Sequence, residues 1–362
     1  MKSAIPVKFI KMAALFCLSL GVLVTSCSKS SSTAPPPPAN KTTLQSSLDS
    51  ANWYISNTAE GTKPGEYTTG SKANLNAAIS SATAILNNSA STQSEMDNAA
   101  ANLNAAILAY KGTYIGQIAA ANLIAYWKFN GNADDSSGNG HNGTVTQGHV
   151  FFGAGTPALT ADRFGNANKA YHFDNGGNVD VPFNAAFNAQ QMSISLWVRQ
   201  DTTGRTINPA NCYMVSLNRW NGWKFQTQPG LPFYTVKTFE SAATPPDTAY
   251  YDRDDAGVAI NPGTTWYHLV VTFKPGEEDF YINGALVKSW TNVPGTPITL
   301  TTPIDLTIGS DLPTSAYSTD PNNANYVNWG GFWKGDLDDV MFYNIALTAP
   351  QVQSIFNNQN TQ

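Results

Sequence analysis

From about residue 123 onward, short apolar runs recur with a period of two and are separated by turn residues. Apolar side chains alternate with others along Met192–Arg199 and again along Trp266–Phe273. Because successive side chains of a strand point to opposite faces of its sheet, this alternation is typical of β-strands. Asn283-Gly284 separates two further runs and is a strong two-residue signal for a β-hairpin. Many short strands with turns between them, and no helical period, predict an all-β sandwich.

Residues 41–113 have a different period. Apolar residues recur there at spacings of three or four, which is the pattern of amphipathic helices. Three runs share this spacing: Leu44, Leu48, Ala51 and Ile55; Leu75, Ala78, Ile79, Ala82 and Leu86; Met96, Ala100, Leu103 and Ile107. Thr92 precedes the third run and Glu95 falls in its first turn, a combination typical of a helix N-terminus. We therefore expect a small three-helix bundle before the sandwich.

The N-terminal residues 1–26 have the pattern of a secretory signal. Three lysines precede an apolar run, Met12–Val24, that is too short for a confident membrane span. Val24-Thr25-Ser26-Cys27 resembles the bacterial lipobox, which implies lipidation of Cys27; the alternative is an ordinary signal peptide cleaved near Ser26. Residues 27–40 contain serines and four consecutive prolines and are expected to form a disordered tether. The resemblance implies an extracytoplasmic protein, lipid-anchored to a bacterial membrane at the outer membrane or cell surface.

Composition narrows the range of partners. Charged residues make up 12% of the chain and the formal net charge is -5, and removal of the signal takes three lysines with it. A basic surface for phosphate backbones is missing, so we expect no nucleic-acid partner and contact with the membrane only through the anchor. Of the three cysteines, Cys212 alone falls in the β region, where a buried structural thiol is expected.

Two blocks at opposite ends of the β region resemble a known family. They are AYWKFNGNADDSSGNGHNG at residues 125–143 and GDLDDVMFYNIAL at residues 335–347, and the segments MSISLWVR, WYHLVVTF, FYINGALV and LTIGSD lie between them in order. Together they resemble the laminin-G-like jelly roll, a concanavalin A-like β-sandwich. The resemblance implies a sandwich over residues 120–360 whose first and last strands pair. The helical region resembles FIVAR-type three-helix modules; an unrelated helical stalk is the alternative.

A calcium site is the first chemical candidate. Oxygen-bearing side chains recur at Asp135, Ser137 and Asn139, as in the opening of an EF-hand loop, but position 12 lacks the glutamate. Laminin-G-like domains commonly carry a structural calcium between the N-terminal loop and the C-terminal strand. The resemblance implies Asp338 or Asp339 as the further ligand. A polar turn without metal is the alternative, because the same residue types favour turns.

Catalytic residues are not expected. Glucanases of the concanavalin-like class carry their carboxylates in a Glu-x-Asp-x-Glu pattern on one strand, and retaining hydrolysis needs two carboxyl groups about 5 Å apart. The glutamates of the β region do not match this pattern, and Glu277 and Glu278 follow Pro275-Gly276 in what is expected to be a solvated turn. Asp336 and Asp338 do alternate, so an aspartate-only glycoside hydrolase stays an alternative. His268 lies on an alternating strand and is expected to be a packed or hydrogen-bonded residue.

Glycan binding is the function that the sequence favours. Aromatic rings that stack on sugars and amides or carboxylates that hydrogen-bond hydroxyls occur together in three segments between the strands. The candidate ligand-binding residues are Trp220, Trp223, Tyr250, Tyr251, Asp252, Tyr326 and Trp329. The alternative for each is a half-buried sandwich residue. We therefore predict non-catalytic recognition of a glycan or glycoprotein. A structural or adhesion module with a protein partner comes second.

Overall fold

The computed structural model describes residues 38–204, 206, 211–239, 248–254, 257–293, 295, 297, 299–300 and 304–361. For residues 239, 248–252, 254 and 292 it describes the backbone alone. The predicted signal, Cys27 and the tether up to Pro37 lie outside the described residues. Among the helices that are described, none is long and apolar enough to cross a membrane.

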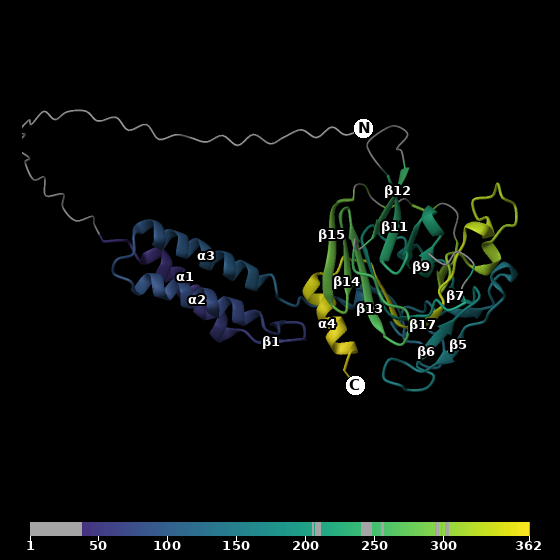
Figure 1. Cartoon of the computed structure of the whole chain (residues 1–362), viewed down its shortest axis with the longest axis horizontal. Coiled ribbons are helices and arrows are strands. Elements are labelled where there is room, and N and C mark those ends of the chain that lie inside the picture. The colour runs from purple at the N-terminus through teal and green to yellow at the C-terminus, as the bar shows by residue number, and fades with distance from the viewer. Residues whose placement is uncertain are drawn as a thin grey trace, which may run out of the picture. The chain divides into compact units, whose positions relative to one another are not determined.

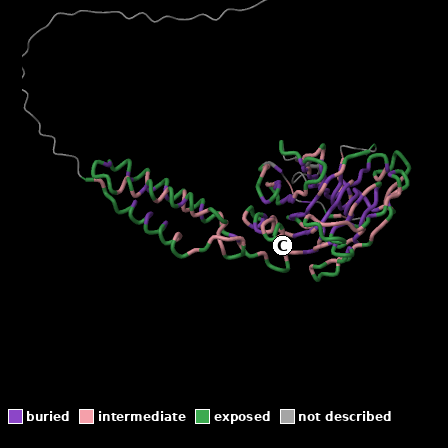
Figure 2. Tube along the Cα trace, turned by 60° about the horizontal axis from the view of Figure 1, so that its bottom comes forward, coloured by how far each residue is buried: buried purple, intermediate pink, exposed green. Residues whose placement is uncertain are grey.

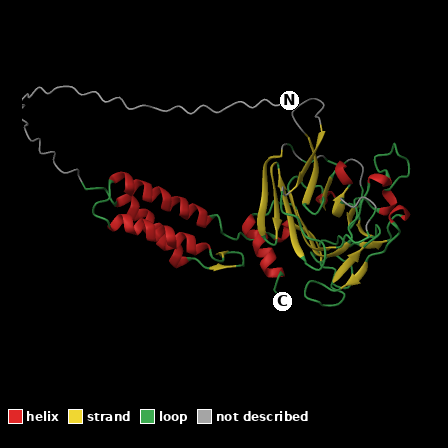
Figure 3. Ribbon diagram, in the orientation of Figure 1, coloured by secondary structure: helices red, strands yellow, loops and turns green. Residues whose placement is uncertain are grey.

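Residues 42–111 form the three expected helices. They are α1 Thr42–Asn57, α2 Ser71–Asn87 and α3 Gln93–Lys111, drawn red in Figure 3. The predicted N-terminus of α3 is confirmed, because the Thr92 side chain accepts from the Glu95 backbone and the Glu95 side chain accepts from the Thr92 backbone. The short parallel strands β1 Glu60–Gly61 and β2 Tyr67–Thr68 connect α1 and α2. The apolar positions that face inward include Leu44, Leu48, Leu75, Met96 and Leu103.

The remainder folds as the predicted β-sandwich (Figure 1). The described strands of one sheet have the order β12-β11-β10-β9-β16-β7-β4, and those of the other β15-β14-β13-β8-β17-β6-β5, with β3 also paired to β17. The first sheet consists of β4 Thr144–Thr146, β7 Asn178–Val181, β9 Cys212–Leu217, β10 Trp223–Thr227, β11 Pro232–Phe239, β12 Thr248–Asp254 and β16 Leu306–Ile308. The second consists of β3 Leu123–Trp127, β5 Ala158–Thr160, β6 Ala170–Phe173, β8 Met192–Gln200, β13 Tyr267–Lys274, β14 Gly276–Ile282, β15 Ala285–Val293 and β17 Gly335–Tyr343.

The first and last strands of the sandwich pair, as the jelly-roll resemblance implied. Trp127 of β3 lies opposite Val340 of β17. The β14–β15 hairpin is also confirmed, because Asn283 and Gly284 both have the positive φ, 51° and 76°, that the predicted turn requires. These pairings close the sheets and fix which side chains face the interior.

The core lies between the two sheets. Figure 2 shows buried residues concentrated in the sandwich, and they include Leu196, Val215, Phe225, Leu269 and Phe342. Cys212 is also buried, as expected. Burial of this apolar area is the main driving force for the sandwich.

A fourth helix, α4 Ala349–Gln359, covers part of the outer face of the β8 sheet. The sequence analysis missed it, although Thr348 and Gln351 form a capping box at its start. Phe356 of α4 stacks on Trp197 of β8 at 5.7 Å between ring centroids. Because the helix covers this face, β8 is buried along nearly its whole length and not on one face alone.

The cover by α4 also explains why His268 is buried. Its side chain is fully buried and its Nε2 lies 2.8 Å from the Ser195 hydroxyl oxygen. The ring also packs against Trp197 and Phe356. The expectation that His268 is a packed, hydrogen-bonded residue is confirmed.

Candidate functional site

Two of the three predicted binding segments meet at the surface of the sandwich. The rings of Trp220 and Trp329 lie 6.2 Å apart between centroids, and Tyr326 lies 5.6 Å from Trp329 and nearly perpendicular to it. Trp329 is 45% exposed, and Trp220 and Tyr326 are half-buried. We call these three residues the aromatic surface. It brings together side chains that are more than a hundred positions apart in the sequence.

The turn after β9 positions Trp220. Asn218 and Arg219 both have positive φ, 61° and 55°, and the short helix η4 Arg219–Asn221 follows. Asn adopts this conformation readily, whereas for Arg it is uncommon and has to be stabilised by surrounding contacts. One such contact is the bond from the Arg219 backbone N–H to the Ser216 hydroxyl, at 3.1 Å. The turn directs Trp220 to the surface while Trp223, at the start of β10, faces the core.

A closed loop positions Trp329 and Tyr326. The helix η6 Val327–Trp329 is anchored by Val327, which is only 4% exposed. The Val327 N–H donates to the Ser318 carbonyl at 2.9 Å, and the Ser318 N–H donates to the Asn325 carbonyl at 3.0 Å. These bonds tie the two ends of the loop together, so Trp329 projects from a backbone with little freedom.

A buried ion pair lies beneath the aromatic surface. Arg219 Nε is 2.5 Å from Asp311 Oδ2, and both side chains are fully buried. The guanidinium carbon lies 4.6 Å from the centroid of the Trp220 ring, and Nη1 lies 3.4 Å from the carbonyl oxygens of Ala324 and Tyr326. Arg219 therefore contacts both segments that form the aromatic surface. A buried pair of this kind needs each partner, since a single buried charge is strongly unfavourable.

The second oxygen of Asp311 binds the loop as well. Asp311 Oδ1 accepts hydrogen bonds from the Tyr317 hydroxyl and from the Gly331 N–H. Burial, and then the Asp311 carboxylate, raise the pKa of Tyr317 well above its usual value. Tyr317 is therefore neutral and donates. The sequence analysis did not single out Asp311, whose partner Arg219 is 92 positions away.

One of the other candidate ligand-binding residues, Trp223, lies in the core and not at this surface. Trp223 is fully buried, its indole N–H donates to the Phe187 carbonyl at 2.8 Å, and its ring stacks on Phe342. It is a core residue, so its prediction as a ligand-binding residue is wrong. Tyr250, Tyr251 and Asp252 belong to β12. The structure describes only the backbone of these three residues.

The predicted calcium ligands are already used as hydrogen-bonding groups. Asp135 Oδ1 accepts from the backbone N–H groups of Tyr126 and Ser137, and Oδ2 accepts from the Ser137 hydroxyl and the His141 N–H, at 2.8 to 3.0 Å. Burial acts to raise the pKa of Asp135, but these four bonds outweigh it and lower the pKa. The Asn139 amide donates to the carbonyls of Leu123 and Ile124. This is the pattern of a turn closed by its own side chains.

The two aspartates predicted as further calcium ligands form ion pairs with an arginine side chain. Asp338 and Asp339 both bind Arg163, at 2.7 and 2.9 Å, next to a bulge in β17 where Asp339 has a φ of 49°. Burial, and then the Asp339 carboxylate, raise the pKa of Asp338, while Arg163 opposes the change. Tyr126 separates the two groups of residues, since its N–H binds Asp135 and its hydroxyl binds Asp339. These residues do not fit one shared ion, and within the described part of the chain no cluster of three His, Cys, Asp or Glu forms a metal site.

Calcium binding therefore stays a prediction from the sequence, and Asp135→Ala tests it. We expect the variant to lose about 2 kcal/mol of unfolding free energy, equally in calcium and in chelator, because four donors lose their acceptor. Scanning calorimetry measures the loss, with the exposed Asp134→Ala as the control. A wild-type melting temperature that rises by several degrees with calcium, and no longer rises in Asp135→Ala, would show that the loop holds the ion.

The carboxylates considered for hydrolysis are held by cations or buried in strands. Asp336 binds Arg199 and His172, at 2.5 and 2.8 Å, and Asp338 binds Arg163. Glu277 pairs with Lys274 on the surface. Glu278 is fully buried in β14, because this strand already begins at Gly276. The expectation that both glutamates lie in a solvated turn is therefore wrong for Glu278. The ion pairs of these aspartates stabilise β17 against its neighbours.

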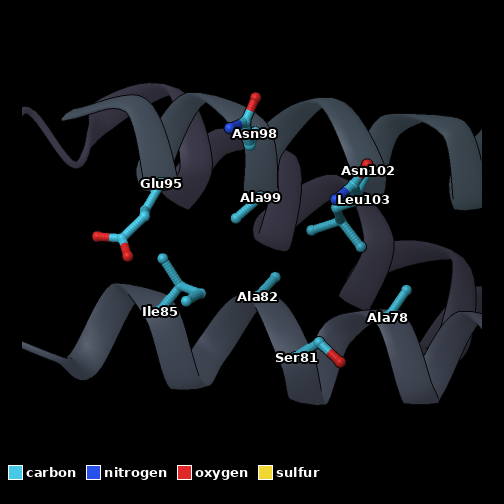
Figure 4. A pocket seen from close by; sticks show the side chains of 9 residues that line it. All are labelled: Ala78, Ser81, Ala82, Ile85, Glu95, Asn98, Ala99, Asn102 and Leu103. Atoms are coloured by element: carbon cyan, nitrogen blue, oxygen red, sulfur yellow. The ribbon is translucent and has the colours of Figure 1, made fainter. Parts of the chain in front are cut away.

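A groove of about 410 Å³ runs between α2 and α3 in the helical region (Figure 4). Small side chains such as Ala78, Ala82 and Ala99 line it, with Asn98 and Asn102 beside them. The groove is the space that alanines leave between two helices. It carries no arrangement of polar groups that converges on a ligand.

Comparisons with known proteins found one family match and several solved structures that resemble this chain. No curated protein matches the sequence. Domain 4 of a GH43 extracellular arabinanase from Geobacillus stearothermophilus, solved in complex with arabinotriose, is 23% identical with a TM-score of 0.47, over 65% of this chain and 98% of that one.

Two toxin binding domains are also similar. The binding domain of Paraclostridial Mosquitocidal Protein 1 is 17% identical with a TM-score of 0.45, over 66% of this chain and 53% of that one. The binding domain of botulinum neurotoxin serotype D/C is 15% identical with a TM-score of 0.42, over 66% and 52%. The chain thus spans about half the length of these two domains.

A family match covers half of the chain. Residues 173–353, from the end of β6 into α4, match a laminin G family described as the concanavalin A-like lectin/glucanases superfamily. This stretch contains the turn with Trp220, the loop with Trp329 and the Arg219–Asp311 pair beneath them. The chain belongs to the concanavalin A-like lectin/glucanases superfamily.

Proposed function

We propose that the protein recognises a carbohydrate without catalysis, and that the sugar binds on the aromatic surface. The observation that supports this most is the meeting of Trp220 and Trp329 at the surface, on a base fixed by the buried Arg219–Asp311 pair. Large aromatic rings dominate the energetics of binding surfaces. A site held in place before binding also loses less entropy when the ligand arrives.

The loop that carries Tyr326 and Trp329 also contains polar side chains of the kinds that bind hydroxyl groups. The loop before Trp329 contains the exposed Asp320, Asn322 and Asn323 and the half-buried Asn325. Amide side chains can both donate to and accept from a hydroxyl, and a carboxylate can accept. A few such groups beside an apolar contact surface give orientation and specificity.

A glycan array on the full chain, compared with Trp329→Ala, tests this proposal. We expect specific hits whose affinity falls by about 2 kcal/mol or more in the variant, because central tryptophans often contribute that much. This corresponds to about 30-fold in Kd. Trp53→Ala is the matched control, since Trp53 is 56% exposed in the helical region. An array without hits, from protein with a native melting curve, would point to a protein partner instead.

We also propose that a lipid at Cys27 anchors the chain outside the cytoplasm, as the lipobox resemblance implies. Several acyl groups together give firm membrane attachment, whereas one chain binds only weakly. Cys27→Ser should therefore move the protein from the membrane fraction to the soluble fraction, which immunoblotting of the two fractions measures. Retention of the variant in the membrane fraction would contradict the anchor. The FIVAR-like identity of the helical region likewise stays a prediction.

A further inference from the structure

The two tryptophans of the aromatic surface are inclined to each other. Their ring planes meet at 51°, with 6.2 Å between centroids. A sugar held between two parallel rings would need about 7 to 8 Å, because each carbon contact takes ~3.5 to 4.0 Å. A ligand therefore lies across the open faces of the rings and is not clamped between them. Two sugars that stack on the two rings are rotated relative to each other by a similar angle.

Contacts beneath and beside the rings fix this inclination. The guanidinium of Arg219 packs over one face of the Trp220 ring. The rings of Tyr326 and Trp329 pack edge to face, with 88° between their planes. Tyr326 and Val327 also belong to a small cluster with Phe152, Tyr317 and Phe332. Flattening the pair into one plane would break contacts on both sides. The surface is therefore not suited to a flat, rigid ligand.

The charges near the rings disfavour a polyanion. The positive charge of Arg219 is fully buried and compensated by Asp311. The exposed carboxylate of Asp320 lies in the loop that carries Tyr326, where it accepts the Asn322 N–H at 2.9 Å. The chain as a whole has a formal net charge of -5. A ligand with repeated carboxylate or sulfate groups would meet repulsion and lose its hydration without compensation.

We propose that the aromatic surface binds a single uncharged glycan chain whose successive sugar rings are rotated relative to one another, at its end or along its length. The flat face of a crystalline polysaccharide and a polyanionic glycan are the ligand classes that it does not take. This inference rests on the proposed function, whose site it uses. It adds the class of ligand, which the family does not specify.

Binding of a defined panel to the full chain tests the ligand class. The soluble uncharged probes are maltohexaose, xylohexaose, arabinohexaose and cellohexaose; the charged probe is hexagalacturonate; the insoluble probes are crystalline cellulose and chitin. Calorimetry measures the soluble probes and sedimentation the insoluble ones. The comparison variants are Trp220→Ala/Trp329→Ala, Trp329→Phe, which keeps an aromatic face, and Trp53→Ala as the control.

We expect at least one of maltohexaose, xylohexaose and arabinohexaose to bind, and to bind more tightly than cellohexaose, whose sugar rings lie nearly in one plane. The affinity should fall 30-fold or more in the double variant, at most a few-fold in Trp329→Phe, and not at all in Trp53→Ala. Retention on crystalline cellulose or chitin, or binding of hexagalacturonate, that disappears in the double variant would overturn the ligand class and leave the proposed function standing. Absence of binding to every probe would overturn both. Uncharged binding that survives in the double variant would place the site elsewhere and overturn this inference. Melting curves confirm that each variant is folded.

Discussion

Asp311→Ala should lower the unfolding free energy of the sandwich by about 3 to 5 kcal/mol, the cost of leaving a buried charge without its partner. Arg219 and Asp311 are both fully buried, so water cannot replace the lost carboxylate. The variant also removes the acceptor of the Tyr317 hydroxyl and the Gly331 N–H. For a domain of this size, about 2 to 4 °C per kcal/mol places the fall in melting temperature at roughly 6 to 20 °C.

Asp320→Ala is the matched control for Asp311→Ala. Asp320 is exposed in the same loop, and its removal should change stability by about 0.5 kcal/mol or less. The double variant Arg219→Met/Asp311→Leu should recover most of the lost stability, because no buried charge is left unpaired. A loss below about 1 kcal/mol in Asp311→Ala, measured by urea unfolding, would show that the pair does not hold the two segments together.

The stability of the sandwich should fall in acid because of His268. Burial, and then the positive charge of Arg163, lower the pKa of His268 to about 3. In the unfolded chain the pKa of His268 has its ordinary value of about 6.5. Between pH 6.5 and pH 3, roughly, the unfolded state therefore binds a proton at His268 that the folded state does not bind. The contribution of His268 is therefore complete above about pH 6.5 and is lost as the pH falls toward 3. One proton corresponds to about 1.4 kcal/mol per pH unit.

Urea unfolding of the wild type and His268→Gln at pH 7, 6, 5 and 4 measures this effect. We expect the difference between the two proteins to shrink by about 1 kcal/mol per pH unit below pH 6, because Gln has no proton to bind. NMR of the wild type provides a second measurement that needs no variant. The His268 ring should show no titration down to pH 4.5, whereas His172 should titrate, since its hydrogen bond to Asp336 raises its pKa. Titration of the His268 ring near pH 6.5 would contradict the account.

The fold could be predicted because its signals are local. The period-two runs, the helical period before them and the Asn283-Gly284 turn depend on residues a few positions apart. The helix α4 has local signals too, in the Thr348–Gln351 capping box and in the spacing of Val352, Ile355 and Phe356. The family resemblance assigns this segment to a sandwich over residues 120–360 and predicts no helix within it.

The site could be predicted only in part. Trp220 and Trp223 have the same residue type three positions apart, yet one is at the surface and the other in the core. Two residues with positive φ in the turn, Asn218 and Arg219, decide between them, and sequence alternation does not reveal such a turn. The Asp135 loop shows the same limit. A calcium loop and a polar turn use the same oxygen-bearing residues, and only the positions of the donors distinguish them.

The central claim is that Trp220 and Trp329 form one glycan-binding surface. Its most direct test is a calorimetric titration of the tightest-binding uncharged hexasaccharide into the wild type, Trp220→Ala, Trp329→Ala, the double variant and Trp53→Ala. The account predicts that each single variant loses about 30-fold in Kd, that the two losses are not additive because the rings share one ligand, and that Trp53→Ala binds as the wild type does. A double variant that binds within twofold of the wild type would contradict it.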